Sequence, residues 1–386
     1  MGFSKILCRL GETALKSDYT RRFFEKKMVS NINKGLKSAK IDFSVRGEPG
    51  RLFIDTKEID KACEVLTKVF GLTSISPVRK VIVKADMEKL VNHAEKFAKK
   101  FIEKGDSFAV RARRTGNQAF TSQMIERRVG ERIVKNIGSR VDLENPDRTL
   151  YIEVRQNKAY FFMEKIKCQG GLPLGTQGNV AALFSGGIDS AVASWMMMKR
   201  GCRVFPLYID SSPYVDGKKN LERAKKVLNE LNNWSVGQKM RLTVIKNGMA
   251  MTEIMEKTRE NLRCLLCKRM MYRIGERFCL KKKAKAIVTG ENLGQVASQT
   301  LDNLGVLNQS IGIPVFRPLL GLNKEEIVKI AENIGTYEPS IISTGDCSAV
   351  PESPRTKGRI GEILREEKNL DIDRLVNKAM KTAKNF

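Results

Sequence analysis

Residues 179–199, which read NVAALFSGGIDSAVASWMMMK, constrain the fold more than any other segment. An apolar run of strand length meets two glycines, and a helical pattern of apolar residues follows at once. A strand that turns through glycines into a helix presents backbone N–H groups at the helix start, where the helix dipole adds partial positive charge. The segment therefore predicts a strand–turn–helix unit that binds phosphate groups.

Three more apolar runs of strand length follow this segment. They cover residues 203–209, 241–246 and 284–290, and helical patterns separate them. Strands that alternate with helices form parallel sheets with helices on their faces. We therefore predict an α/β domain with a parallel sheet over residues 179–386.

The first 178 residues have a different organisation. Residues 1–75 show a strand, a helix, a hairpin across Gly47–Gly50 and a second helix, which predicts a small α+β domain. Residues 76–167 predict a second α+β domain with a helix, a strand, another helix and two strands joined at Gln156–Asn157. The glycine-rich residues 168–178 predict a linker.

The glycine turn carries its own chemical signal. Gly186 and Gly187 let a phosphate approach the backbone, and Ser185 and Ser190 add hydroxyl donors. No Gly-Lys-Ser or Gly-Lys-Thr follows, so this is not a Walker A loop. Asp189 is instead placed to position Mg²⁺ on a pyrophosphate, which favours attack at the α-phosphate of ATP. The pattern S-G-G-x-D-S resembles the PP-loop of ATP pyrophosphatases, which adenylate a carbonyl-type oxygen and release pyrophosphate.

Three of the eight cysteines suggest reactive sulfur. Cys264 and Cys267 are three apart on a helical run beside Lys268, and Cys347 lies in a loop rich in Gly, Ser and Pro. We expect the nearby cations to lower the pKa of these thiols. Three interpretations stay open: an iron–sulfur cluster with one open iron, a persulfide and disulfide relay, or buried core cysteines. A zinc site would need a fourth ligand, for which Cys279 is the weaker candidate.

The charge of the chain indicates a polyanionic partner. Lys and Arg number 70 against 43 Asp and Glu, a formal charge of +27, and both halves of the chain are basic. Thermophilic proteins normally contain more acidic and more basic residues together, whereas an excess of basic residues alone favours a nucleic acid as the partner. Apolar runs fall far short of a membrane span, and no export signal is recognisable. We therefore expect a cytoplasmic protein that binds RNA and not a membrane.

Nearly the whole chain resembles the tRNA 4-thiouridine synthetase family. The matching segments occur in the family's order and cover residues 9–28, 108–133, 141–154, 170–178, 183–201, 267–276, 289–300 and 345–354. The resemblance implies a ferredoxin-like domain over residues 1–75, a THUMP domain over 76–167, the linker 168–178, and a PP-loop catalytic domain over 179–386. It corresponds to the form that lacks a C-terminal rhodanese domain.

The resemblance also implies an activity and a nucleotide site. Family members bind tRNA, adenylate O4 of uridine 8 with ATP and Mg²⁺, and replace AMP with sulfur. Asp189, Cys264, Cys267 and Cys347 would act in catalysis. The residues that would bind ATP are Leu183, Phe184, Ser185, Gly186, Gly187, Asp189, Ser190, Tyr208, Ile209, Lys268, Gly290 and Gln299.

Archaeal-type members use cysteine-ligated clusters, so the resemblance favours Cys264, Cys267 and Cys347 as ligands of a [4Fe–4S] or [3Fe–4S] cluster. A persulfide and disulfide relay through the same thiols is the alternative. The sulfur donor would be sulfide or a persulfide carrier. A homodimer would let one RNA reach from the binding domain of one chain to the catalytic domain of another.

Basic residues of the second domain are the candidates for tRNA contact. Arg111 and Arg113 alternate with apolar residues and so share one strand face, and the next helix adds Arg127, Arg128, Arg132 and Lys135. Two alternatives to the 4-thiouridine reaction remain. One is another PP-loop RNA-modifying enzyme, with 2-thiouridine or ligation chemistry, and the other is a tRNA-binding module with a degenerate catalytic domain.

Overall fold

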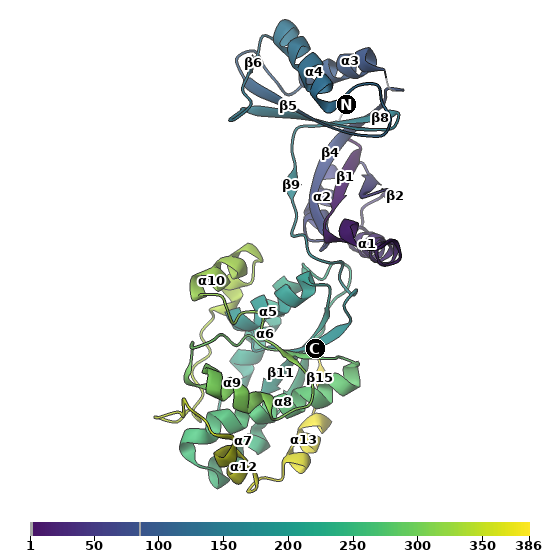
Figure 1. Ribbon diagram of the computed structural model, residues 1–386. Helices are drawn as coiled ribbons and strands as arrows, with labels where there is room; N and C mark the ends of the chain where they lie inside the picture. Colours follow the sequence, from purple (N-terminus) through teal and green to yellow (C-terminus); the bar gives the residue numbers. More distant parts are fainter. Residues whose placement is uncertain (1–2, 85) are drawn as a thin grey trace. The chain divides into compact units, whose positions relative to one another are not determined.

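The computed structural model describes residues 3–84 and 86–386. The chain divides into two compact units, Met1–Gly171 and Leu172–Phe386 (Figure 1). Both units combine helices with sheets, and the second contains the parallel sheet that the sequence predicts. The predicted fold class is therefore confirmed.

Unit 1 is built on one mixed sheet with the strand order β2-β3-β1-β4-β8-β7-β5-β6, and β9 pairs with β4. Its strands are β1 (Lys5–Leu10), β2 (Ser44–Glu48), β3 (Arg51–Asp55), β4 (Leu72–Ile82), β5 (Ser107–Thr115), β6 (Arg140–Val141), β7 (Arg148–Arg155), β8 (Lys158–Phe162) and β9 (Ile166–Lys167). Its helices are the 3₁₀ helix η1 (Glu12–Leu15), α1 (Asp18–Ser38), α2 (Ile59–Thr67), α3 (Met87–Ala98) and α4 (Ser122–Ile137).

Strand β4 belongs to both halves of this sheet. Its first part pairs antiparallel with β1, with Ser76 opposite Leu7, and its last part pairs antiparallel with β8, with Arg79 opposite Phe161. The strand therefore crosses the boundary that the sequence suggests between residues 75 and 76. The sequence analysis assigned no strand here, and this long shared strand is what joins the two predicted N-terminal domains.

Buried ion pairs tie the same two halves together. Glu153 on β7 accepts a hydrogen bond from Nε of Arg51 on β3 at 3.0 Å, and Arg155 donates to Glu48 on β2 at 3.1 Å. Arg155 and Glu153 are both buried. Buried charges are stable only when they are paired. These pairs fix how β7 lies relative to β2 and β3.

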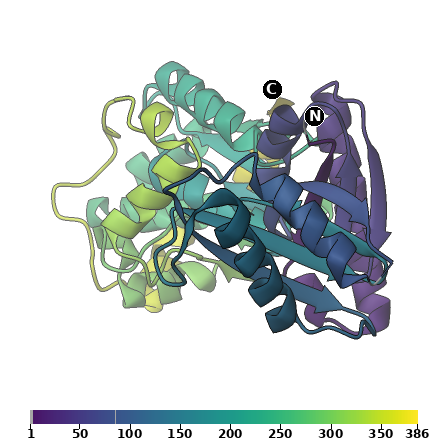
Figure 2. The same cartoon turned by 90° about the horizontal axis from the view of Figure 1, so that it is seen from above.

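Helices α3 and α4 lie side by side on one face of the sheet (Figures 1 and 2). The Asp86 and Thr121 side chains cap their first turns by accepting from the amides of Lys89 and Met124. The apolar side chains that these helices bury against β5, β7 and β8 include Leu90, Val91, Phe97, Ile125, Val129 and Ile133.

Unit 2 contains a second sheet with the order β14-β13-β10-β11-β12-β15. The first five strands in this order are parallel, as predicted, and β15 pairs antiparallel with β12. The strands are β10 (Asn179–Leu183), β11 (Arg203–Asp210), β12 (Thr243–Lys246), β13 (Ile287–Val288), β14 (Val315–Phe316) and β15 (Lys384–Asn385).

The helices of unit 2 surround this sheet. They are α5 (Ile188–Lys199), α6 (Gly217–Asn232), α7 (Gly248–Lys257), η2 (Glu260–Leu262), α8 (Arg263–Lys282), η3 (Ala297–Gln299), α9 (Leu301–Asn308), α10 (Lys324–Asn333), α11 (Tyr337–Ser340), α12 (Ile360–Glu367) and α13 (Ile372–Lys381). Residues 168–178 contain no helix or strand, and the boundary between the two compact units falls among them, after Gly171. No helix in the described part of the chain has the length and apolar character needed to cross a membrane.

Helix α8 is the central helix of the unit 2 core. Its apolar side chains, among them Leu265, Leu266, Met270 and Phe278, pack in a buried apolar cluster of this unit. The same helix buries Arg269, whose guanidinium donates two hydrogen bonds to Glu367 of α12 at 2.8 and 2.9 Å. Arg273 donates two more to the same carboxylate. One carboxylate thus anchors α8, which carries Cys264 and Cys267, to α12.

The Glu367→Gln variant is expected to lower the free energy of unfolding by about 3 kcal/mol, because it leaves the buried Arg269 without its counter-charge. Burial alone would raise the pKa of Glu367, but the hydrogen bonds from Arg269 and Arg273 outweigh it and lower the pKa. The stabilisation is therefore present above the pKa of an unfolded glutamate, about 4.3, and is lost as the pH falls through the lower folded value.

Urea unfolding of the two proteins measures this difference. Glu366→Gln is the matched control, because Glu366 is the neighbouring residue and pairs with the half-exposed Arg259. This control should cost less than about 1 kcal/mol. Equal losses from the two variants would contradict the role given to the buried pair.

Candidate active site

The glycine turn follows β10 and begins α5. Gly186 has φ +76°, and a Cβ at this position would lie 2.5 Å from Cα of Ala224, so only glycine fits. Gly187 is the N-cap residue, and no side chain caps the first turn of α5. The Ser185 hydroxyl accepts from the Gly187 amide at 3.2 Å, and the Ser190 hydroxyl donates to the Gly187 carbonyl at 3.0 Å. The turn thus leaves the helix N-terminus open for an anion.

Gly290, which follows β13, closes one side of this turn. A Cβ at Gly290 would lie 2.6 Å from the carbonyl carbon of Asp189, so the two backbones are in direct contact. Gln299 shapes the segment after Gly290: its Oε1 accepts from the Asn292 amide at 3.2 Å, and its carbonyl accepts from the Gly294 amide at 3.0 Å. Two residues that the family resemblance assigns to the nucleotide site therefore belong to this segment.

The carboxyl ends of β10 and β11 supply the predicted apolar part of the nucleotide site. Leu183 lies opposite Leu207 in the parallel register, and the Phe184 amide donates to the Leu207 carbonyl at 2.8 Å. Tyr208 and Ile209 come next on β11. Burial, with a contribution from Asp210, raises the pKa of Tyr208 to about 12, so its hydroxyl stays protonated.

Asp189 in the first turn of α5 contacts two residues that the sequence analysis did not single out. Nζ of Lys324, the first residue of α10, lies 2.8 Å from Oδ1 of Asp189. Nε2 of Gln295 donates to Oδ2 at 3.3 Å. The PP-loop lacks its own lysine, and Lys324 brings an ammonium group to the turn from a distant part of the chain.

Glu291 is the centre of a buried polar cluster beside the turn. Its carboxylate accepts hydrogen bonds from Lys268 at 3.1 Å, Tyr272 at 2.5 Å, Arg317 at 2.7 Å and Thr289 at 3.0 Å. Burial would raise the pKa of Glu291, but Lys268, Tyr272 and Arg317 together lower it, so the carboxylate is ionised. Lys268, predicted to bind ATP, is therefore held by a residue adjacent to Gly290.

The three predicted thiols are neighbours. Cys347 and Cys264 both act electrostatically on Cys267, and Cys347 acts on Cys264. Burial raises the pKa of Cys264 and raises that of Cys267 to about 12, and the opposing effect of Lys268 is smaller. The expectation that nearby cations lower the pKa of these thiols is thus wrong for Cys264 and Cys267. Desolvation outweighs the single cation for both thiols: Cys267 packs against the apolar core, and Cys264 is only partly exposed.

The loop that carries Cys347 is attached to the rest of unit 2 by hydrogen bonds. The Ser348 amide donates to the Tyr214 carbonyl at 2.9 Å, and the Thr344 hydroxyl donates to Asn220 at 3.0 Å. Among residues 3–84 and 86–386, no three Cys, His, Asp or Glu side chains are arranged as a ready-made metal site. The thiols nonetheless provide the donor chemistry that iron–sulfur clusters use.

A continuous set of contacts links the thiols to the glycine turn. Cys267 precedes Lys268, Lys268 bonds to Glu291, and Glu291 follows Gly290, which packs on the backbone of Asp189. The segment that carries Cys267 and the glycine turn are thus connected through Lys268, Glu291 and Gly290, at the carboxyl edge of the parallel sheet. This edge is where open α/β sheets bind their ligands.

The basic residues predicted to bind tRNA separate into two groups in unit 1. Arg111, Arg127 and Lys135 line a cavity of about 610 Å³ between β5, α4 and β6, whose floor includes the exposed apolar Val141 and Leu143. Arg113 lies two residues along β5 and is exposed on the same strand. Arg128 and Arg132 pair with Glu88 of α3 at 3.2 Å and 3.1 Å, and Arg127 of the first group pairs with Glu131 of its own helix at 2.9 Å.

Models of three protein families match successive parts of the chain. The ferredoxin-like domain of ThiI matches residues 5–76, the THUMP domain matches residues 84–164, and the family described as thiamine biosynthesis protein (ThiI) matches residues 175–372. The chain belongs to the ThiI family. The resemblance seen in the sequence is confirmed, including the ferredoxin-like, THUMP and PP-loop parts of the fold.

Relatives of the ThiI family match over nearly the full length. A probable tRNA sulfurtransferase of Methanosarcina mazei is 41% identical over 98% of this chain and 94% of its own. One from Thermococcus kodakarensis is 42% identical over 94% of this chain and 96% of its own. The crystal structure of a 4-thiouridine synthetase–RNA complex with bound ATP has a TM-score of 0.86 and 30% identity, and it covers 100% of this chain and 99% of that chain.

Proposed function

We propose that the protein is an ATP-dependent tRNA sulfurtransferase that converts uridine 8 of tRNA to 4-thiouridine. The observation that carries this proposal is the set of contacts that joins three neighbouring thiols to the glycine turn through Lys268 and Glu291. The likeness to an RNA-bound and ATP-bound 4-thiouridine synthetase over the whole chain supports it. A phosphate site alone would suit many PP-loop reactions, whereas adjacent thiols suit sulfur insertion.

In the first step, ATP lies with its phosphates on the turn Ser185–Ser190. The uridine O4 attacks the α-phosphorus, the bond to the β-phosphate oxygen breaks, and pyrophosphate leaves. Asp189 would orient Mg²⁺ and the departing pyrophosphate, and the open N-terminus of α5 stabilises the developing negative charge. Lys324 would bind a terminal phosphate with its ammonium group, which already lies at this turn.

In the second step, sulfur attacks C4 of the adenylated uridine and AMP leaves. Cys347 would carry the sulfur as a persulfide, and a thiol of Cys264 or Cys267 would then form a disulfide with it as the terminal sulfur is released. Alternatively, Cys264, Cys267 and Cys347 would hold a [4Fe–4S] or [3Fe–4S] cluster, which would supply bound sulfide. Burial raises the pKa of both Cys264 and Cys267, which favours the protonated thiols, and ligation or disulfide formation would displace these protons.

The remaining partners follow from the same reaction. The cavity lined by Arg111, Arg127 and Lys135 would contact the tRNA, and Arg113 would extend that surface along β5. Arg128 and Arg132 would join only if RNA phosphates replaced Glu88 as their partner. We also propose sulfide or a persulfide carrier as the sulfur donor, a homodimer as the working assembly, and a cytoplasmic location.

Mass spectrometry of the product nucleosides tests the proposal. The purified protein, a tRNA transcript, ATP, Mg²⁺ and either sulfide or a persulfide donor should yield 4-thiouridine and one pyrophosphate for each sulfur inserted. A 2-thiouridine or ligated product would assign another PP-loop reaction. Binding of tRNA without pyrophosphate release would indicate a degenerate catalytic domain. Iron and sulfide analysis of anaerobically purified protein separates the two sulfur routes, since an iron-free and fully active protein excludes the cluster.

The Lys324→Met variant is expected to raise the Kd for MgATP by about 10- to 100-fold, since a hydrogen bond to a charged group contributes about 1.5–3 kcal/mol. Lys329→Met is the matched control, because Lys329 lies on the same helix, is exposed and should leave the Kd unchanged. Isothermal titration with a non-hydrolysable ATP analogue measures both. An unchanged Kd in Lys324→Met would remove this lysine from the phosphate site.

A further inference from the structure

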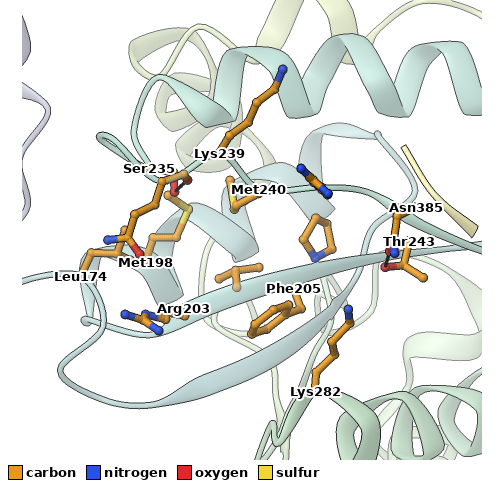
Figure 3. Close-up of a pocket in the computed structure, with 14 residues that line it drawn as sticks. Leu174, Met198, Arg203, Phe205, Ser235, Lys239, Met240, Thr243, Lys282 and Asn385 are labelled. Atoms are coloured by element: carbon orange, nitrogen blue, oxygen red, sulfur yellow. Dashed lines mark hydrogen bonds between the residues drawn. The ribbon is translucent and has the colours of Figure 1, made fainter. Parts of the chain in front are cut away.

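A second cavity of about 350 Å³ lies at the opposite edge of the unit 2 sheet from the glycine turn (Figure 3). Arg203 and Thr243, which line it, are the first residues of β11 and β12. The glycine turn instead follows the last residue of β10, which is parallel to β11. Strand β11 is 8 residues long, or about 26 Å at a strand rise of about 3.3 Å per residue. This cavity is therefore separate from the nucleotide site.

Positive side chains surround this cavity. Four cationic residues line it, namely Arg203, Lys239, Arg241 and Lys282, and its described lining contains no Asp or Glu. None of the four makes an ion pair within the described part of the chain. Lys282 extends toward Phe205 (Figure 3), and its Nζ lies 5.7 Å from the centre of that ring.

This arrangement differs from that of several arginines that are more buried. Arg155, Arg269 and Arg273 all have carboxylate partners. Four like charges around one cavity repel one another, and an anion that entered it would relieve the repulsion. The chemistry of the lining is therefore that of an anion site.

The lining favours a phosphate group over a nucleobase. Phe205 is the only aromatic residue among the described lining residues, and the Lys282 ammonium already lies 5.7 Å from the centre of its ring, so the lining offers little for base stacking. Arginine and lysine side chains recognise phosphate oxygens through charge and hydrogen bonds. Arg203, Lys239 and Arg241 are exposed, so the site is accessible to a large polyanion.

The position of the cavity indicates which polyanion. Leu174, in the segment that joins unit 1 to unit 2, is one of the lining residues. That segment is fixed to unit 2 by hydrogen bonds from the Leu172 amide to Lys199 and from the Gly175 amide to Gly201. An RNA bound by unit 1 is thus attached through this segment to the domain that contains the cavity, which raises its local concentration for unit 2.

We propose that this cavity binds backbone phosphates of the RNA substrate, at a distance from the reacting base. The inference rests on the proposed function for the identity of the RNA. The site contributes affinity and orientation and no chemistry. Free pyrophosphate, a product of the proposed reaction, is the other source of the same ligand chemistry.

The double variant Arg203→Gln, Arg241→Gln tests this. If two phosphate contacts are lost, the Kd for tRNA should rise by about 10-fold or more at 0.15 M salt, and the slope of log K against log salt should become shallower by about 1.5–2. The turnover number at saturating tRNA and the Kd for MgATP should not change. The matched control Arg277→Gln, Arg365→Gln removes the same charge elsewhere on unit 2 and should change the Kd less than 2-fold.

Two measurements complete the test. Titration of inorganic pyrophosphate into the protein without ATP distinguishes the sources: loss of pyrophosphate binding in the double variant, with the Kd for tRNA unchanged, assigns a product site and overturns the RNA contact. A variant identical to wild type in tRNA Kd, salt slope and pyrophosphate binding overturns the site altogether. In either case, normal thiolation of tRNA by the wild-type protein is still consistent with the proposed function. If the wild-type protein neither binds nor thiolates tRNA, the proposed function itself is wrong.

Discussion

The Asp189→Asn variant should adenylate tRNA about 10³-fold more slowly, while its Kd for tRNA stays the same. A rate loss of this size is typical when one contact to the transition state is removed in a closed site. Asparagine keeps the size of the side chain but not the charge that would orient Mg²⁺. Asp189 lies in the first turn of α5, and its carboxylate is held by Lys324 of α10 and by Gln295 of the loop after β13.

The control for this variant comes from the chain itself. Helix α13 also begins with Ile and Asp, at Ile372 and Asp373, and the Asp373 side chain is 88% exposed. Asp373→Asn therefore removes the same charge from the same position of a helix, and activity should not change. Pyrophosphate release in the presence of tRNA measures both. Normal release by Asp189→Asn would contradict the assignment of the turn as the phosphate site.

In the Cys347→Ala variant, the rate of sulfur insertion should fall by about 10³-fold or more, while pyrophosphate is still released. The two steps use different groups: adenylation depends on the glycine turn and sulfur transfer on the thiols. The product should be an adenylated tRNA that reverts to uridine on hydrolysis. Quantification of AMP, pyrophosphate and 4-thiouridine in one reaction shows which step has failed.

Cys202→Ala is the matched control for Cys347, because Cys202 is buried just before β11 and has no contact with the other thiols in the described structure. It should keep both activities. Thiolation at the wild-type rate by Cys347→Ala would leave Cys264 and Cys267 as the only sulfur-handling pair. Loss of both steps, with unfolding curves unchanged, would mean that Cys347 also shapes the nucleotide site.

Local patterns were sufficient to predict much of this molecule. The glycine turn, the four parallel strands β10 to β13 and the hairpin of β2 and β3 all follow from short apolar runs and turn residues. Strand β4 was missed because its polar residues interrupt the apolar alternation: it reads LTSISPVRKVI, and pairing on both edges stabilises it. Strands β14 and β15, two residues each, carry no recognisable pattern.

Sequence patterns alone indicated candidate site residues only where they are close in sequence, whereas Tyr208, Gly290 and Gln299 were suggested by the family resemblance. Residues of the turn and the C-x-x-C pair form recognisable motifs. Lys324, Glu291 and Arg317 do not, because a lone lysine, glutamate or arginine has no pattern until the fold brings it to another segment. The raised pKa of Cys267 was missed for a related reason: the sequence shows the neighbouring lysine but not the surrounding apolar core.

Strand β4 has a consequence for the first 167 residues. Strand β4 is hydrogen-bonded to β1 in its first part and to β8 in its last part. Removing either half of the sheet would therefore leave the other half with unpaired backbone groups along β4. The ferredoxin-like and THUMP parts should therefore melt in a single cooperative transition, and the RNA would meet one stiff surface rather than two modules free to swivel. Limited proteolysis should therefore spare residues 72–82.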